Sequence, residues 1–227
     1  MANLIEDRLL RDKVYVFKDR KEAGRLLARK LSGYKDVHGI VLGIPSGGVP
    51  VAAEIAKVLG LSLDVIIVRK IQLPDNTEAG FGAVRPDGEV SLNTNLITQL
   101  RLTEEEVKRQ IQITVDTIKR RNELFREGRP FPFLKDKVVI IVDDGLASGY
   151  TMLSAVDFIK RHKPERVVIA VPTAPKGTVD LILPQVDEVV CLNVRSGFTF
   201  AVANAYEKWY DLEDGEVISI LRSFHIG

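Results

Sequence analysis

The stretch VVIIVDDGLASGYT, residues 138–151, decides the fold of this chain. Its first five residues, Val138 to Val142, are apolar at every position, which is typical of a central parallel strand covered by helices on both faces. Two carboxylates, Asp143 and Asp144, follow directly. In open α/β sheets ligands lie beyond the carboxyl ends of the strands. The stretch therefore predicts an α/β fold with a candidate ligand site at the two aspartates.

The residues after the aspartates suit a phosphorylated sugar. Gly145, Ala147, Ser148 and Gly149 have little side-chain bulk, so the backbone can wrap closely around an anion and direct N–H groups at it. Thr151 is expected to open a helix, whose first turn offers unpaired N–H groups and the positive end of the helix dipole. The carboxylates can accept hydrogen bonds from a diol such as the ribose hydroxyls. The carboxylates would thus bind the sugar and the backbone would bind the phosphate.

The rest of the chain alternates strands and helices, which indicates a mainly parallel sheet of about five strands flanked by helices. Asp19 followed by Glu22 resembles the capping box of a first helix. Right-handed crossovers would bring the carboxyl ends of the strands to one edge of the sheet. The expected strands are residues 40–44, 63–68, 138–142, 167–171 and 188–192, and the expected helices include residues 51–59, one beginning at Thr151 and one beginning near Lys176.

Residues 138–151 match the signature of the type I phosphoribosyltransferases, which bind 5-phosphoribosyl 1-pyrophosphate (PRPP). The chain as a whole looks most like phosphoribosyltransferase-like proteins of unassigned substrate. The chain has no G-x-x-x-x-G-K-[ST], the signature of a P-loop. A G-x-G-x-x-G pattern begins at Gly80, but Arg85 stands in place of its last glycine. The resemblance implies the type I phosphoribosyltransferase fold, with a flexible loop and a small hood. The PRPP-binding residues that it implies on this loop are Asp143, Asp144, Gly145, Leu146, Ala147, Ser148, Gly149, Tyr150 and Thr151.

Two further segments resemble the pyrophosphate-binding parts of this family. Ser46, Gly47 and Gly48 lie between two prolines after an expected strand, where the family holds pyrophosphate with exposed amides. Arg69 and Lys70 follow the next strand, where the family places basic residues, and a polyanionic leaving group would accept their charge-assisted hydrogen bonds. Asp143, Asp144 and Lys70 are the candidate catalytic residues.

Residues 71–98 are polar and contain glycine and proline, with two short strands expected near residues 82–84 and 89–92. In the family this interval is the flexible loop that closes over the reactants. Closure would exclude water, which competes with the base for the activated sugar. Glu78 and Arg85 are the candidates to act in this loop.

Thr103 and Glu106 predict a capping box at the start of a long helix that ends near Arg126. Apolar residues recur along one side of this segment, so the helix is expected to serve as scaffold or as an oligomer contact.

The C-terminal segment, residues 193–227, is rich in aromatic residues and resembles the hood that holds the acceptor base in this fold. Phe200 and Phe198 are the candidates to stack on the base, although packing of the last helix against the sheet would explain them equally well. Glu207 stands where hypoxanthine-guanine phosphoribosyltransferases carry an acidic residue near the metal. One departure counts against a 6-oxopurine: those enzymes have a lysine where this chain has Val171, Pro172 and Thr173.

Length and composition agree with one soluble enzyme domain. The 227 residues, 45% hydrophobic and 28% charged, suffice for one phosphoribosyltransferase domain over residues 1–227, with its core at about 14–192 and its hood at 193–227. A net charge of +1 favours neither nucleic acid nor membrane as a partner. The lone Cys191 is expected in a buried strand. No apolar run is long enough to be a signal peptide or a membrane span, so a cytoplasmic location is expected.

The sequence therefore predicts an Mg²⁺-dependent transferase that moves the phosphoribosyl group of PRPP to a nucleobase-like acceptor and releases pyrophosphate. Mg²⁺ would be held mostly by substrate oxygens and water. A homodimer is the family expectation. Two alternatives stay open: a regulatory protein that binds PRPP or a nucleotide without efficient catalysis, and an enzyme of phosphorolysis or hydrolysis that acts on another phosphorylated pentose.

Overall fold

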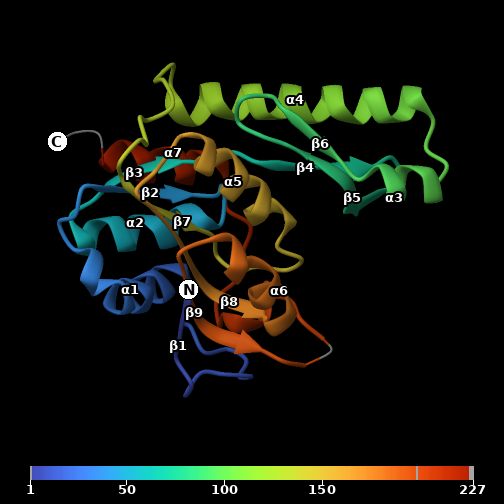
Figure 1. Ribbon diagram of the computed structural model, residues 1–227. Coiled ribbons are helices and arrows are strands. Elements are labelled where there is room, and N and C mark those ends of the chain that lie inside the picture. The colour runs from blue at the N-terminus through green and yellow to red at the C-terminus, as the bar shows by residue number, and fades with distance from the viewer. Residues whose placement is uncertain (1, 198, 225–227) are drawn as a thin grey trace.

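A computed structural model describes residues 2–197 and 199–224, and for residues 76–79 it describes the backbone only. Its central sheet consists of six parallel strands in the order β1-β9-β8-β7-β2-β3 (Figure 1). The five strands expected from the sequence are all present, which confirms the α/β class. The strands are β1 (Asn3–Glu6), β2 (Gly39–Gly43), β3 (Ser62–Val65), β7 (Val138–Val142), β8 (Arg166–Pro175) and β9 (Glu188–Arg195).

The sixth strand, β1, was not expected from the sequence. It pairs in parallel with β9, with Asn3 opposite Glu188, and the Asn3 side-chain amide donates to the Glu188 carboxylate over 3.2 Å. A four-residue strand at a sheet edge offers too short an apolar pattern to be recognised. The estimate of about five strands is therefore one strand short.

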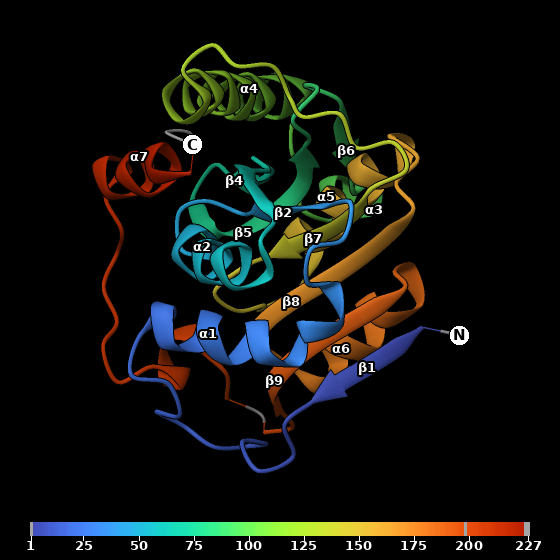
Figure 2. The ribbon, with the colours of Figure 1, turned by 90° about the vertical axis from the view of Figure 1, so that its left-hand side faces the viewer.

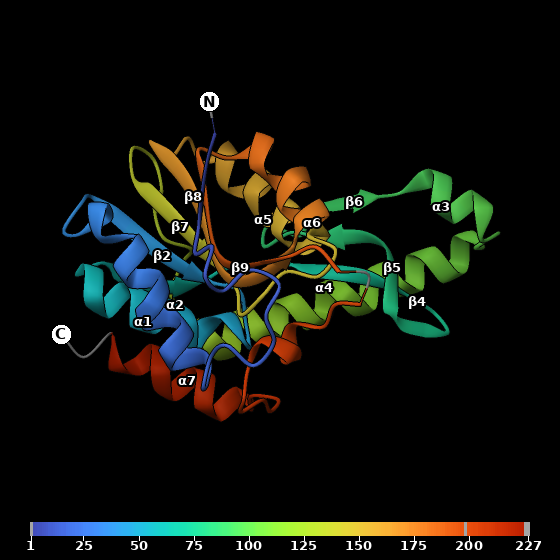
Figure 3. The ribbon, with the colours of Figure 1, turned by 90° about the horizontal axis from the view of Figure 1, so that it is seen from below.

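Helices cover both faces of the sheet, as Figure 3 shows from below. On one face, Val41, Ile140 and Val168 share a core with α1, α2 and α7. On the other face, Leu42, Ile141 and Ile169 pack against α5 and α6. This two-sided burial explains why the central strands are apolar at every position. The helices are α1 (Arg20–Lys30), α2 (Gly48–Leu59), α5 (Tyr150–Arg161), α6 (Lys176–Ile182) and α7 (Asp214–Ser223).

The interval after β3 forms a second, antiparallel sheet of three strands, β4 (Arg69–Leu73), β5 (Asn76–Val84) and β6 (Val90–Leu92). The two short strands expected in this interval correspond to the end of β5 and to β6. A short helix, α3 (Thr94–Gln99), follows, and this part projects beyond the central sheet beneath α4 (Figure 1). The segment expected as a flexible loop thus has regular secondary structure.

The long helix α4 (Glu104–Arg126) begins with the predicted capping box. The Glu106 N–H donates to the Thr103 hydroxyl over 3.2 Å, and the Thr103 N–H donates to the Glu106 carboxylate over 2.8 Å. The helix runs alongside the second sheet, where it contacts β4 and β5, and it also contacts α7 (Figure 1). Its role as scaffold or oligomer contact stays a prediction.

After β9 the chain passes α1 on the outside of the molecule and ends in α7, near α2 and α4 (Figure 2). It includes a short 3₁₀ helix, η3 (Val202–Ala205); two others are η1 (Ser32–Tyr34) and η2 (Leu183–Gln185). A bridge between Phe17 and Tyr206 ties this return segment to the start of α1. The C-terminal segment is thereby held close to the carboxyl edge of the central sheet.

Cys191 lies in β9 and is fully buried, as expected. Burial raises the pKa of its thiol to about 12, so the thiol stays protonated at neutral pH. Among residues 2–197 and 199–224, no helix combines the length and the apolar character that a bilayer crossing would need.

Candidate active site

The loop after β7 carries the two aspartates into helix α5, which begins at Tyr150, one residue before the predicted start. Neighbouring elements fix this loop, residues 143–151, called here the phosphate loop. The Leu146 N–H donates to the Thr173 carbonyl over 2.9 Å, and the Thr178 hydroxyl donates to the Ala147 carbonyl over 2.6 Å. Gly149 caps the helix with a φ of +80°, a conformation that favours glycine. The first-turn N–H groups of α5 are therefore held at the sheet edge, where an anion can bind.

A second loop, residues 45–48, lies directly against the two aspartates. A Cβ atom on Gly47 would lie 1.9 Å from the Asp144 Oδ2 atom, and one on Gly48 would lie 2.6 Å from the Val142 carbonyl oxygen. Both glycines are required here by close approach of the two loops. The peptide bond between Pro45 and Ser46 is cis.

The two loops and the start of β4 enclose a cavity of about 490 Å³. The cavity unites residues from both candidate segments with both aspartates. Two predicted residues lie elsewhere: Gly48 packs behind the loop, and Tyr150 is exposed and faces a neighbouring cavity under β5 and β6. Of the predicted PRPP-binding residues, the lining contains Ser46, Gly47, Arg69, Lys70, Asp143, Asp144, Gly145, Leu146, Ala147, Ser148, Gly149 and Thr151.

Three cationic side chains, Arg69, Lys70 and Arg121, line the same cavity. Burial, with the nearby charge of Arg121, lowers the pKa of Arg69, as expected where cations gather without enough anions to balance them. Arg121 comes from α4 and pairs with Asp214 of α7 over 3.6 Å. Sequence analysis missed it because an arginine on a charge-rich helix gives no signal of its own.

Both aspartates are half-buried, and their carboxyl groups differ in surroundings. Burial, followed by the charge of Asp144, raises the pKa of Asp143 well above its usual range. Burial also raises the pKa of Asp144, but Arg20 opposes that rise. The site thus holds one aspartate beside a fixed cation and one aspartate that protonates readily.

Arg20, the partner of Asp144, was not predicted. Its Nε and Nη2 atoms each lie 2.8 Å from the Asp144 Oδ2 atom, and its side chain is nearly buried. The residue begins α1 and comes 124 positions before its partner, so no local spacing connects the two.

Two of the three predicted hood residues, Phe200 and Glu207, lie in the described part of the chain. Phe200 is half-buried and Glu207 is exposed, and neither is among the described residues that line the cavity. Phe198 lies outside the described residues. Val202 lines the cavity. It also lies close to Gly145, since a Cβ atom on Gly145 would lie only 2.5 Å from the Val202 Cγ1 atom. The C-terminal segment therefore contacts the phosphate loop through Val202.

Of the two predicted loop residues, Glu78 and Arg85, only Arg85 can be placed, and it is not among the described residues that line the cavity. The Glu78 side chain lies outside what is described. The guanidinium of Arg85 is held by Asp157 of α5 and by Glu89 after the β5–β6 turn. Arg85 thus anchors the second sheet to α5.

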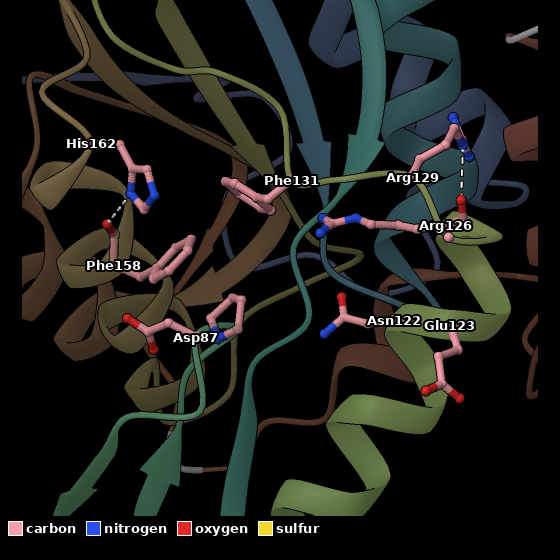
Figure 4. Close-up of a pocket in the computed structure, with 10 residues that line it drawn as sticks. Asp87, Asn122, Glu123, Arg126, Arg129, Phe131, Phe158 and His162 are labelled. Atoms are coloured by element: carbon pink, nitrogen blue, oxygen red, sulfur yellow. Dashed lines mark hydrogen bonds between the residues drawn. The ribbon is translucent and has the colours of Figure 1, made fainter.

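A second cavity, of about 500 Å³, lies near the other end of α5 (Figure 4). Phe131, Phe158 and His162 form an aromatic cluster on one side, with ring centroids 4.5 to 5.6 Å apart. Arg126 reaches toward this cluster from α4 and lies 4.5 Å from the Phe131 ring. It also pairs with Asp64 over 3.3 Å. This cavity contains neither aspartate and is separate from the candidate site.

Known proteins similar to the chain agree with this arrangement. A family model described as phosphoribosyl transferase domain matches residues 18–207. A protein of Mycobacterium tuberculosis (strain ATCC 25618 / H37Rv), named "Putative phosphoribosyl transferase Rv0571c", is 38% identical over 210 residues. The match covers 92% of this chain and 47% of that protein, and a protein of strain CDC 1551 / Oshkosh matches equally. The chain thus spans about half the length of these relatives.

The crystal structure of the protein TT1426 from Thermus thermophilus is similar in both sequence and fold. It is 37% identical, with a TM-score of 0.75, and the match covers 92% of this chain and 98% of that chain. Most of this chain therefore has a counterpart in a solved structure.

Proposed function

The chain belongs to the phosphoribosyltransferase family, and we propose that it transfers the phosphoribosyl group of PRPP to a nitrogenous base with release of pyrophosphate. One observation carries the proposal. A single cavity combines the start of a helix, two adjacent carboxylates and three cations, which are groups that suit a phosphorylated sugar with a polyanionic leaving group.

The phosphate loop would hold the 5-phosphate through the N–H groups of residues 147–151. The hydroxyls of Ser148 and Thr151, which line the cavity, add two donors. Asp143 and Asp144 would accept hydrogen bonds from the ribose hydroxyls. Their negative charge would also stabilise the positive charge that develops on the ring as the bond to pyrophosphate breaks.

The three cations that line the cavity would hold the leaving group. Arg69, Lys70 and Arg121 share this lining with residues of the loop at 45–48. Because they are fixed before the reaction, they can neutralise the departing pyrophosphate without reorganisation. This contribution is electrostatic and requires no protein nucleophile.

The donor set fits Mg²⁺ that is bound chiefly by its substrate. Among the side chains that the structure describes, no group of three His, Cys, Asp or Glu residues is placed to hold a metal ion. Mg²⁺ commonly uses one or two carboxylates together with phosphate oxygens and water. The ion would supply positive charge to the leaving group.

The acceptor is proposed to be a planar, nucleobase-like molecule held by the segment that carries Phe198 and Phe200. The contact between Val202 and Gly145 supports this, since it brings that segment to the phosphate loop. On the family resemblance alone, we also propose that the protein is a single-domain, cytoplasmic homodimer.

The test is release of pyrophosphate from PRPP and Mg²⁺ with a panel of purine and pyrimidine bases. We expect release with one base or one class of bases. We expect a loss of about a hundredfold or more in the Asp144→Asn variant, because a carboxylate that faces the developing charge is removed. Asp116→Asn, on the exposed side of α4, is the matched control and should keep full activity.

Other outcomes would overturn parts of the proposal. Tight binding of PRPP without release of pyrophosphate in the presence of any base would favour a regulatory protein. Release without a base would favour hydrolysis. Absence of PRPP binding would contradict the proposed function altogether.

A further inference from the structure

Arg20 joins the candidate site to the C-terminal segment. Only 7% of the residue is exposed. Two of its nitrogen atoms lie 2.8 Å from the Asp144 Oδ2 atom, and its third, Nη1, donates to the Tyr210 carbonyl over 2.9 Å. All three guanidinium nitrogens therefore have a fixed acceptor, and a guanidinium is suited to such a fork because it is planar and always charged.

Aromatic rings hold the guanidinium from the side. Its central carbon lies 4.0 Å from the centroid of the Trp209 ring, at a distance typical of a cation–π contact. Tyr206 lies next to Trp209, with ring centroids 5.3 Å apart, and its hydroxyl donates to the Asp144 carbonyl over 2.6 Å. Asp144 is therefore held at its carboxylate by Arg20 and at its backbone by Tyr206.

The charges around Asp144 show what Arg20 contributes. Asp143 faces Asp144 from its own loop, and the Tyr206 hydroxyl faces it from the C-terminal segment. The cations Arg69, Lys70 and Arg121 line the same cavity. Arg20 contacts the carboxylate directly, and two adjacent half-buried carboxylates would otherwise favour protonation of one of them.

Resting on the proposed function, we propose that Arg20 is a positioning residue for PRPP. It holds Asp144 as an anion in one orientation, and Trp209 and the Tyr210 carbonyl hold Arg20 in turn. The C-terminal segment thereby sets the geometry of the ribose site as well as bordering it. The ribose hydroxyls would find an acceptor whose charge and direction are fixed before binding.

The experiment is calorimetric titration of the protein with PRPP in the presence of Mg²⁺, at pH 6 to 9. Each variant is compared with the unaltered protein at the same pH. We expect Arg20→Gln to weaken PRPP binding by about tenfold or more at pH 7. The deficit should shrink toward pH 9, because the unpaired Asp144 then ionises without help. Arg20→Lys keeps the charge but cannot form all three hydrogen bonds, so its deficit should be smaller and nearly independent of pH.

Two further variants separate positioning from folding. Trp209→Leu leaves Asp144 and Arg20 in place but removes the ring beneath the guanidinium. It should change the pH dependence of PRPP affinity in the same direction as Arg20→Gln, by a smaller amount. Arg25→Gln, on the exposed side of the same helix, removes only a 3.4 Å pair with Glu54 and should bind PRPP normally. Melting temperatures measured alongside report any loss of folded protein.

The outcomes are distinguishable. Failure of the unaltered protein to bind PRPP would overturn the proposed function and this inference with it. Normal binding by Arg20→Gln would overturn the inference alone. A deficit equal at every pH, accompanied by a lowered melting temperature, would assign Arg20 a merely structural role and contradict it as well.

Discussion

The phosphate loop and strand β4 of the second sheet both line the candidate site, but different forces hold the loop and the second sheet. The phosphate loop packs against α6. Gly149 has a positive φ, and a Cβ atom there would lie 2.7 Å from the Cγ2 atom of Thr178 in α6. The second sheet is tied to α5 by Arg85, whose partners Asp157 and Glu89 are more than half exposed. The packing of the phosphate loop (the phosphate side) should therefore depend little on ionic strength but be sensitive to substitutions. The attachment of the second sheet (the pyrophosphate side) should depend on ionic strength and be less sensitive to substitutions.

The largest expected effect lies on the phosphate side, in Asp143→Asn. We expect PRPP affinity to fall by about a hundredfold or more, because the variant loses one of the two carboxylates that would bind the ribose hydroxyls. The unliganded variant should nevertheless be more stable than the unaltered protein at neutral pH. The pKa of Asp143 is raised by folding, so its contribution to the free energy of unfolding declines as pH rises from the unfolded to the folded pKa.

Thermal unfolding at pH 5 and pH 8 checks the stability part. The gain from Asp143→Asn should be larger at pH 8, and Asp116→Asn should show no such gain. A variant that is less stable than the unaltered protein at pH 8 would contradict the account of this carboxyl group.

The next largest effect should come from Gly149→Ala, which tests the packing of the phosphate loop. The new methyl group would meet Thr178 and strain the backbone, so the loop must move and PRPP affinity should fall by about tenfold or more. Thr178→Ser in the same chain removes the clashing methyl group but keeps the hydroxyl that binds the Ala147 carbonyl, and it should restore part of the affinity.

Gly177→Ala is the matched control for this variant. Nothing lies within 4 Å of the position that its Cβ atom would take, so calorimetry should find unchanged PRPP affinity. Full affinity in Gly149→Ala would show that the loop is not fixed by packing.

The same contrast explains what could be predicted from the sequence. The phosphate loop follows a strand that is buried on both faces, so local composition alone predicted the strand, the aspartates and the start of α5. Arg20 and Arg121 could not be predicted, because each reaches the site from a helix distant in sequence. Strand β1 was missed since an edge strand of four residues has almost no pattern. Arg85 was predicted to act in a flexible loop, and its exposed partners left no signal of the anchoring ion pairs.

The smallest expected effect is that of Arg85→Gln on the pyrophosphate side. Loss of the pairs with Asp157 and Glu89 should loosen the second sheet without changing the phosphate loop, so PRPP affinity should fall only about twofold to threefold. The difference should be largest at low ionic strength, where these pairs contribute most to the unaltered protein. Titrations at about 20 mM and about 500 mM salt would check this, and a loss independent of salt would contradict the proposed role of the ion pairs.

The most direct test of the account is a crystal structure of the protein with PRPP and Mg²⁺. We predict the 5-phosphate within hydrogen-bond distance of the N–H groups of residues 147–151, the ribose hydroxyls at Asp143 and Asp144, and the pyrophosphate near Lys70. PRPP bound elsewhere, as in the cavity near His162, or with its pyrophosphate at the start of α5, would contradict it.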